Sequence, residues 1–376
     1  MPSWEPPPDP HRPPLPYRPG FAMHIAEHEP PQPFGSRAYP PSTRPVPSRD
    51  WMRKTPQTQQ VLANPPQHTQ WPSKTPPRSA LLTVTRAIAT GKGPKQAAQL
   101  VVCQVLFDGQ QKPYTVVAKI YDSLYHDLWD PFAAEPLDVG WLADCHYSRE
   151  ASAYRQLQQT KSLQKPGFAP EYYGSWTISL PLTLEGKQHR RSIRLVLIEY
   201  LAGSTIRDLQ TKIEPVHLRV GNEMATVSYP DGHAYHYSGQ YRLNILAEVL
   251  EGFMMQVHSG VSQGDLAPRN VMLVPSPQGT MPPGSLPRVA LIDYNLAVVS
   301  RFTKYASSRP KTSRPRNPAE CWWDDRLVQW DGWVPTHWLQ PRGWQFAEEW
   351  LWATFVKNNP DRFGPILEKL EVNHEL

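Results

Sequence analysis

The sequence predicts an α+β protein with two lobes, in which an antiparallel sheet with one helix precedes a shortened, mainly helical lobe. Three observations lead to this prediction. Proline is concentrated at the N-terminus, where residues 1–80 hold 22 of the 44 prolines among 376 residues. Segments rich in β-branched residues then recur up to about residue 200 and surround a single helical segment. Amphipathic helical segments and a tryptophan-rich stretch dominate the remainder.

The N-terminal segment, residues 1–78, is predicted to be disordered. Its frequent prolines remove backbone N–H donors and block helices, and the apolar residues between them follow no period. One stretch, Pro13-Pro14-Leu15-Pro16-Tyr17-Arg18, fits a P-x-x-P-x-R ligand, which makes a protein with an SH3-type groove a candidate partner.

Charge, cysteine content and hydropathy exclude several classes of function. Residues 1–80 hold 9 Lys or Arg against 5 Asp or Glu, so most of the formal net charge of +5 lies there. The near-neutral remainder argues against a dedicated nucleic-acid-binding surface. Three scattered cysteines suit neither a disulfide framework nor a zinc site. Without a signal peptide or an apolar run long enough to span a membrane, we expect an intracellular protein, cytoplasmic or nuclear.

The first lobe is predicted over residues 79–200. Its helix is expected at Cys145–Gln159, because apolar residues recur there at helical spacing. A Gly91-x-Gly93 turn joins the first two strands. The expected strands are Leu81–Ala87, Ala98–Phe107, Tyr114–Tyr121, Tyr172–Leu180 and Ile193–Tyr200.

The second lobe is predicted over residues 201–376. An amphipathic pattern predicts a helix at Tyr241–His258, and a second helix is expected at Trp344–Lys357. Two short apolar strands, Val271–Val274 and Val289–Ile292, lie between them. A cleft between two such lobes is where ligands bind.

Polar residues at three places indicate phosphoryl transfer. The loop Gly264–Asn270 places Asp265 and Asn270 five residues apart, as a base for the attacking hydroxyl and a Mg²⁺ ligand would be. Asp293 ends an apolar strand, where a carboxylate suits a Mg²⁺ ion. Lys119, in an apolar strand, would pair with Glu150 of the helix and point its ammonium at phosphates. The alternatives are a polar turn, a capping Asp and an edge Lys that blocks strand pairing.

These motifs, taken in order, resemble a divergent eukaryotic protein kinase-like family and look most like fungal kinase-like proteins. The similarity covers roughly residues 81–300 and includes Val-Ala-Lys, Leu-Val-Leu-Ile-Glu-Tyr, Gly-Asp-x-x-x-x-Asn and Ile-Asp-Tyr. It implies a bilobal protein kinase-like fold that uses ATP and Mg²⁺. It also implies a role for each residue. Lys119 would contact the α- and β-phosphates and be held by Glu150, while Gly91 and Gly93 would turn the loop over the phosphates. Glu199 and the backbone of Leu201 would contact adenine, Asp265 would be the catalytic base, and Asn270 and Asp293 would be the metal ligands.

The leading functional prediction is a phosphotransferase that acts on a protein hydroxyl. The sequence departs from the family pattern at Gln96, where a third glycine is expected, and at Gln263-Gly264, where His-Arg is expected. Two alternatives remain open on these grounds. One is a pseudokinase scaffold that binds nucleotide or a partner protein. The other is a small-molecule kinase of the aminoglycoside- or choline-kinase-like type, which also has Gly-Asp in this loop.

Overall fold

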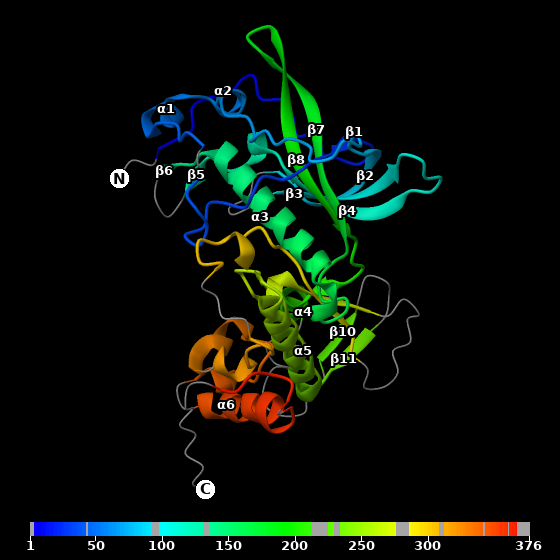
Figure 1. Ribbon diagram of the computed structural model, residues 1–376, viewed down its shortest axis with the longest axis vertical. Coiled ribbons are helices and arrows are strands. Elements are labelled where there is room, and N and C mark those ends of the chain that lie inside the picture. Colours follow the sequence, from blue (N-terminus) through cyan, green and yellow to red (C-terminus); the bar gives the residue numbers. More distant parts are fainter. Residues whose placement is uncertain are drawn as a thin grey trace. The chain divides into compact units, whose positions relative to one another are not determined.

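The computed structural model divides the chain into two compact units, each assembled from separate stretches (Figure 1). Unit 1 comprises Met1–Arg155, Glu171–Tyr200 and Tyr294–Lys304, and unit 2 comprises Gln156–Pro170, Leu201–Asp293 and Tyr305–Leu376. The residues described are 4–42, 44–91, 98–130, 135–212, 225–228, 234–275, 286–307, 312–322, 324–340, 343–359 and 361–366.

Unit 1 is built on a closed, six-stranded antiparallel barrel. Around the barrel, the strands are β1 (Ala22–Glu27), β2 (Ser79–Ala89), β3 (Gln99–Phe107), β4 (Tyr114–Tyr121), β8 (Lys187–Glu199) and β7 (Tyr172–Leu184). Strand β1 closes the ring because it pairs with β2 from Ala22 to Ala26 and with β7 at Ala26 and Glu27.

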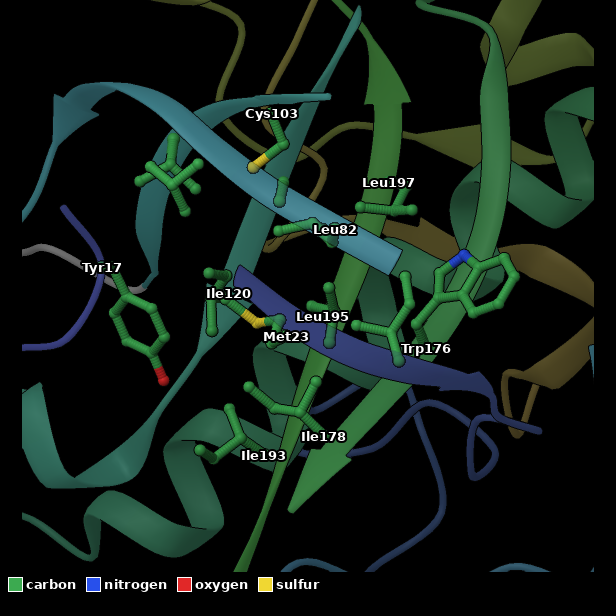
Figure 2. Close-up of a cluster of buried hydrophobic side chains, with 14 of the residues drawn as sticks. Tyr17, Met23, Leu82, Cys103, Ile120, Trp176, Ile178, Ile193, Leu195 and Leu197 are labelled. Atoms are coloured by element: carbon green, nitrogen blue, oxygen red, sulfur yellow. The ribbon is translucent and has the colours of Figure 1, made fainter. Parts of the chain in front are cut away.

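The barrel interior is filled by apolar side chains from all six strands. Figure 2 shows side chains from several strands gathered in one cluster, among them Met23 of β1, Trp176 of β7 and Leu195 of β8. Alternate residues of each strand point inward, and the inward set of β1, Met23 and Ile25, is 6% and 1% exposed. Burial of apolar area is the main term that stabilises such an interior.

Unit 1 has further elements outside the six barrel strands. The long helix α3 (Val139–Gln159) carries Glu150, and its last four residues belong to unit 2. The remaining elements are α1 (Arg49–Lys54), α2 (Gln57–Ala63), η1 (Ser123–Tyr125), β5 (Trp129–Asp130), β6 (Glu135–Pro136), β15 (Val298–Val299) and η5 (Ser300–Phe302).

Unit 2 contains the helix α5 (Gly239–His258) and a small sheet in the order β14 (Arg288–Leu291), β13 (Val271–Val274), β9 (Ser204–Thr205). Leu291 N–H donates to the carbonyl of Phe168, which ties β14 to the 156–170 stretch. Its further elements are η2 (Lys161–Leu163), α4 (Ile206–Lys212), β10 (Ala225–Ser228), β11 (Ala234–Tyr237), β12 (Val261–Ser262), η4 (Pro268–Asn270), η6 (Pro318–Glu320), η7 (Asp324–Trp330), η8 (Thr336–Leu339), α6 (Trp344–Trp352) and the π-helix η9 (Ala353–Lys357).

The predicted fold class is wrong. The sheet is not an open one with a single helix, since its six strands close into a barrel, and six α-helices occur in the described residues rather than a mainly helical second lobe. The two units divide between Tyr200 and Leu201, and in addition 156–170 belongs to unit 2 and 294–304 to unit 1. The physical reason for closure is the sixth strand, which the N-terminal segment supplies.

The N-terminal segment, predicted to be disordered, contains β1, α1 and α2 and is tied to the barrel by side chains. Tyr17, 1% exposed, donates its O–H to Asp122 Oδ2 at 2.6 Å. Tyr125 donates its O–H to the carbonyls of Pro13 (3.1 Å) and Pro14 (2.9 Å). The P-x-x-P-x-R stretch therefore packs on the chain itself. An SH3-type partner stays a prediction, and its binding would require this stretch to leave Asp122 and Tyr125.

None of the helices formed by the described residues combines the length and the apolar content needed to cross a membrane.

Candidate functional site

Unit 1 contains the predicted Lys119–Glu150 ion pair. Lys119 Nζ lies 2.6 Å from Glu150 Oε2 and 2.8 Å from Oε1. Both residues are buried, with Lys119 4% and Glu150 0% exposed. Glu150 also accepts hydrogen bonds from the Tyr121 O–H and, at 3.4 Å, from the Tyr294 backbone N–H. The buried carboxylate is therefore surrounded by hydrogen-bond donors.

Strand alternation explains why these groups meet. Val116, Ala118 and Ile120 of β4 point into the barrel core, so Lys119 and Tyr121 lie on the outer face of the same strand. Glu150 reaches this face from α3. Tyr121 was not foreseen from the sequence, although its position two residues after Lys119 was a sufficient signal.

Unit 2 contains the predicted catalytic loop, in which Asp265 is held by two neighbours. Arg269 Nη2 donates to both carboxylate oxygens, at 2.6 and 2.7 Å. Asn270 Nδ2 donates to the Asp265 carbonyl at 2.8 Å and to Oδ2 at 3.0 Å. The Asp265 side chain is 29% exposed, so the carboxylate is fixed in direction and still reaches solvent.

Gln263 joins this loop to the strand end that carries Asp293. Its Nε2 donates to the carbonyls of Ile292 (3.1 Å) and Asp293 (2.6 Å), while its Oε1 accepts from the Asp265 N–H (2.7 Å). Gln263 is fully buried. The sequence singled out this residue only as a departure from a family pattern, whereas the structure makes it the link between Asp265 and Asp293.

Asp293 has an unusual backbone conformation. Its φ is +64°, which lies in the left-handed region. This conformation is energetically unfavourable for any residue that has a side chain. The Gln263 hydrogen bond to its carbonyl supports this conformation. Strain of this kind persists where the surrounding structure holds it, and such positions cluster at functional sites.

The donor set of unit 2 is suited in kind to Mg²⁺. Asn270 uses Nδ2 as donor, which leaves Oδ1 as the end of that side chain able to bind a cation, and Asp293 supplies a carboxylate. Mg²⁺ prefers oxygen ligands and is usually held by one or two carboxylates together with substrate phosphates. Among the described residues, no group of three or more His, Cys, Asp or Glu side chains is placed to hold a metal ion. An ion at Asn270 and Asp293 would need further ligands, such as the oxygens of a bound phosphate.

The predicted nucleotide-contacting residues are distributed over both units. Gly91, with φ +100°, exchanges two hydrogen bonds with the Gln99 side chain, and Gly93 lies outside the described residues. Glu199 ends β8, where its N–H donates to the Glu171 carbonyl and its Oε2 accepts from the Glu171 N–H. The Leu201 carbonyl accepts from the Gly203 N–H.

The structure thus brings the predicted residues into two groups. Lys119 and Glu150 meet in unit 1, and Asp265, Asn270 and Asp293 are linked through Gln263 in unit 2. A scan against protein-family models finds no match, and no curated protein matches the chain significantly.

Proposed function

We propose that the chain is an ATP- and Mg²⁺-dependent phosphotransferase that acts on a protein hydroxyl. The observation that carries the proposal is the buried Lys119–Glu150 pair. A buried salt bridge contributes little to stability, since removing two charges from water costs several kcal/mol per ion. A cation fixed by a carboxylate is instead an arrangement that phosphoryl-transfer sites use to position phosphates.

Each residue has a role that follows from its contacts. Asp265, oriented by Arg269 and Asn270, would align the acceptor hydroxyl and take its proton. Lys119 would offset negative charge on the phosphates. Gln263 would hold the separation between Asp265 and Asp293. Asn270 and Asp293 would hold Mg²⁺, which supplies charge neutralisation on the transferring phosphoryl group.

The test combines nucleotide binding with turnover. Thermal shift with Mg·ATP and phosphotransfer to peptide pools are measured for the wild type and for Asp265→Asn. We expect Asp265→Asn to keep the thermal shift and to lower turnover by about 10²–10⁴-fold, the usual contribution of a general base. The matched control is Asp361→Asn, whose side chain is 91% exposed. Equal turnover in wild type and Asp265→Asn would exclude the catalytic role.

A second candidate, a nucleotide- or partner-binding scaffold, is favoured by one observation. Lys119 is only 4% exposed, and its ammonium is already paired with Glu150. A thermal shift without turnover on any acceptor would select the scaffold. Turnover on hydroxylated metabolites but not on peptides would select a small-molecule kinase.

A further inference from the structure

We propose that residues 28–39 form a strap that holds α3 in place and thereby positions the Lys119–Glu150 pair. The strap contacts α3 at well-separated points. Arg155 donates from Nη1 and Nη2 to the two Glu29 carboxylate oxygens, at 2.6 and 3.0 Å. His28 Nδ1 lies 2.7 Å from the Tyr147 hydroxyl.

A third contact lies toward the middle of the helix, on the N-terminal side of Glu150. The Phe34 carbonyl accepts from Arg149 Nε at 2.7 Å and from Cys145 Sγ at 3.3 Å. Since a helix rises 1.5 Å per residue, the contacts from Cys145 to Arg155 cover about 15 Å of α3. Glu150 lies inside this interval, so the strap fixes the helix on both sides of it.

The strap reaches Glu150 through one further side chain. The Tyr147 ring packs against the Tyr121 ring with centroids 5.9 Å apart, and the Tyr121 O–H donates to Glu150. A continuous set of contacts therefore leads from His28 through Tyr147 and Tyr121 to the ion pair.

The far end of the strap holds the segment that follows Tyr294. The Val299 N–H donates to the Tyr39 hydroxyl (2.7 Å), which donates to the Ala297 carbonyl (3.1 Å). Lys304 N–H donates to the Ala38 carbonyl at 3.0 Å. Since the Tyr294 N–H is itself a donor to Glu150, the strap fixes both α3 and the backbone that contacts its carboxylate.

The composition of the strap suits this role. Pro30, Pro31 and Pro33 are buried and have no N–H, so this stretch cannot lengthen β1 as a full ladder partner and keeps an extended form. Gly35, with φ +79°, approaches α3 so closely that a Cβ would lie 2.5 Å from Cys145 Sγ and 2.8 Å from the Trp141 ring. The sequence thus favours an extended segment seated against the helix.

Cysteine alkylation tests the strap without reference to activity. Cys145 on α3 is 1% exposed and Cys103 in the barrel is 0% exposed, so Cys103 serves as the internal standard. Gly35→Ala should raise the native-state alkylation rate of Cys145 by about tenfold or more, because the added methyl displaces the strap. The matched control is Gly20→Ala, which has a similar φ of +86° but nothing within 4 Å of the new Cβ.

A second variant acts at a distance from Cys145. Glu29→Arg should also raise Cys145 alkylation, and the charge-swapped pair Glu29→Arg with Arg155→Glu should restore protection. The strap inference is overturned if Cys145 is as protected in Gly35→Ala and Glu29→Arg as in the wild type, or if Cys103 becomes reactive in parallel, which would report general unfolding.

The consequence for turnover rests on the proposed function. With the phosphotransfer assay, Glu29→Arg should lower kcat by about tenfold or more and the charge swap should recover it, since catalytic groups must be held closely in place. Wild-type turnover in a Glu29→Arg variant with exposed Cys145 would refute the positioning role. Absence of turnover in the wild type, with Cys145 responding as expected, would refute the proposed function and leave the strap.

Discussion

In unit 1, the polar contacts of the candidate site converge on Glu150. It is fully buried and binds the Lys119 ammonium, the Tyr121 hydroxyl and the Tyr294 N–H. A charged carboxylate without such partners would be strongly destabilising in this place. Because every contact acts on the same two oxygens, we expect the effects of substitutions in this group to be strongly non-additive.

The first prediction concerns the ion pair. Lys119→Met should lower the free energy of unfolding by about 3–5 kcal/mol, because it leaves a buried carboxylate without its cation. The double variant Lys119→Met with Glu150→Gln should be more stable than Lys119→Met, since the Gln has no charge and can still bind the Tyr121 hydroxyl. Urea unfolding of the wild type, both single variants and the double variant measures the coupling. Additive effects would contradict a direct interaction.

The sequence was sufficient to predict this ion pair but not its surroundings. Strand alternation placed Lys119 on one face, and helical spacing placed Glu150 toward the sheet. The two-residue period of a strand and the 3.6-residue period of a helix were therefore enough to predict that the two side chains face each other. Gln263 could not be predicted in the same way. Its role depends on the backbone carbonyls of Ile292 and Asp293, which lie about thirty residues away in sequence. Every residue has a backbone carbonyl, so the residue types do not identify such partners.

At the scale of elements, the strands and helices that periodicity predicted are found close to their predicted positions, whereas the short strands and the N-terminal elements were not predicted. β4 has its predicted bounds, Tyr114–Tyr121. β7 extends beyond its predicted end at Leu180, and β8 begins well before its predicted start at Ile193, so that the two strands meet in a tight turn. Glu185 and Gly186 there have φ values of +49° and +77°, which is the geometry of a two-residue hairpin turn. This hairpin extends beyond the barrel in Figure 1. Its β8 part, residues 187–192, has no apolar residue and so lacks the alternation that predicts a strand.

The second prediction concerns α5 and its packing. A Cβ at Gly252 would lie 2.5 Å from two ring atoms of Phe168. Gly252→Ala gains at most about 1 kcal/mol in helix propensity, whereas overpacking costs about 1–3 kcal/mol. We therefore expect a lower melting temperature. Gly239→Ala, in the first position of the same helix with open space around it, is the control and should be neutral or stabilising.

The third prediction concerns the pH dependence of the N-terminal segment. Burial, assisted by the charges of Arg194 and His68, lowers the pKa of His28 to about 3. The folded state therefore keeps His28 neutral while the unfolded state takes up a proton, so stability is lost as pH falls from about 6.5 toward 3. At pH 5 the loss is about 2 kcal/mol, from 1.36 kcal/mol per pKa unit. His28→Gln should remove it, as measured by urea unfolding at pH 7 and pH 5.

Two comparisons make this assignment specific. The exposed His24→Gln variant, on the neighbouring strand β1, should keep the wild-type difference between the two pH values. Asp144 changes stability in the opposite direction to His28, and it does so in every variant. Burial raises the pKa of its carboxyl to about 6, so its protonation stabilises the folded state as pH falls from 6 to 4. An unchanged pH dependence in His28→Gln would exclude the imidazole as the source.

At the scale of the whole molecule, the closed barrel was the feature that sequence reasoning missed. Proline density over residues 1–80 indicated disorder, but residues 20–29 contain no proline, a gap long enough for the six residues of β1. Whether such a segment forms a strand depends on the strand edges with which it can pair. Here it meets β2 on one side and β7 on the other, and two unpaired edges of a curved sheet are a strong template for a further strand. Local composition contains none of this information.

The last prediction tests how far the core depends on that closure. Ile25 of β1 is 1% exposed and belongs to the same apolar cluster as Leu82, Leu195 and Trp176. Ile25→Ala should lower the free energy of unfolding by about 2–5 kcal/mol, because it removes buried methyl groups and leaves a cavity. His24→Ala, on the exposed outer face of β1, should change it by less than about 0.5 kcal/mol. If both variants unfold at the wild-type urea concentration, β1 is not part of the cooperative core, and the barrel is in effect an open five-stranded sheet.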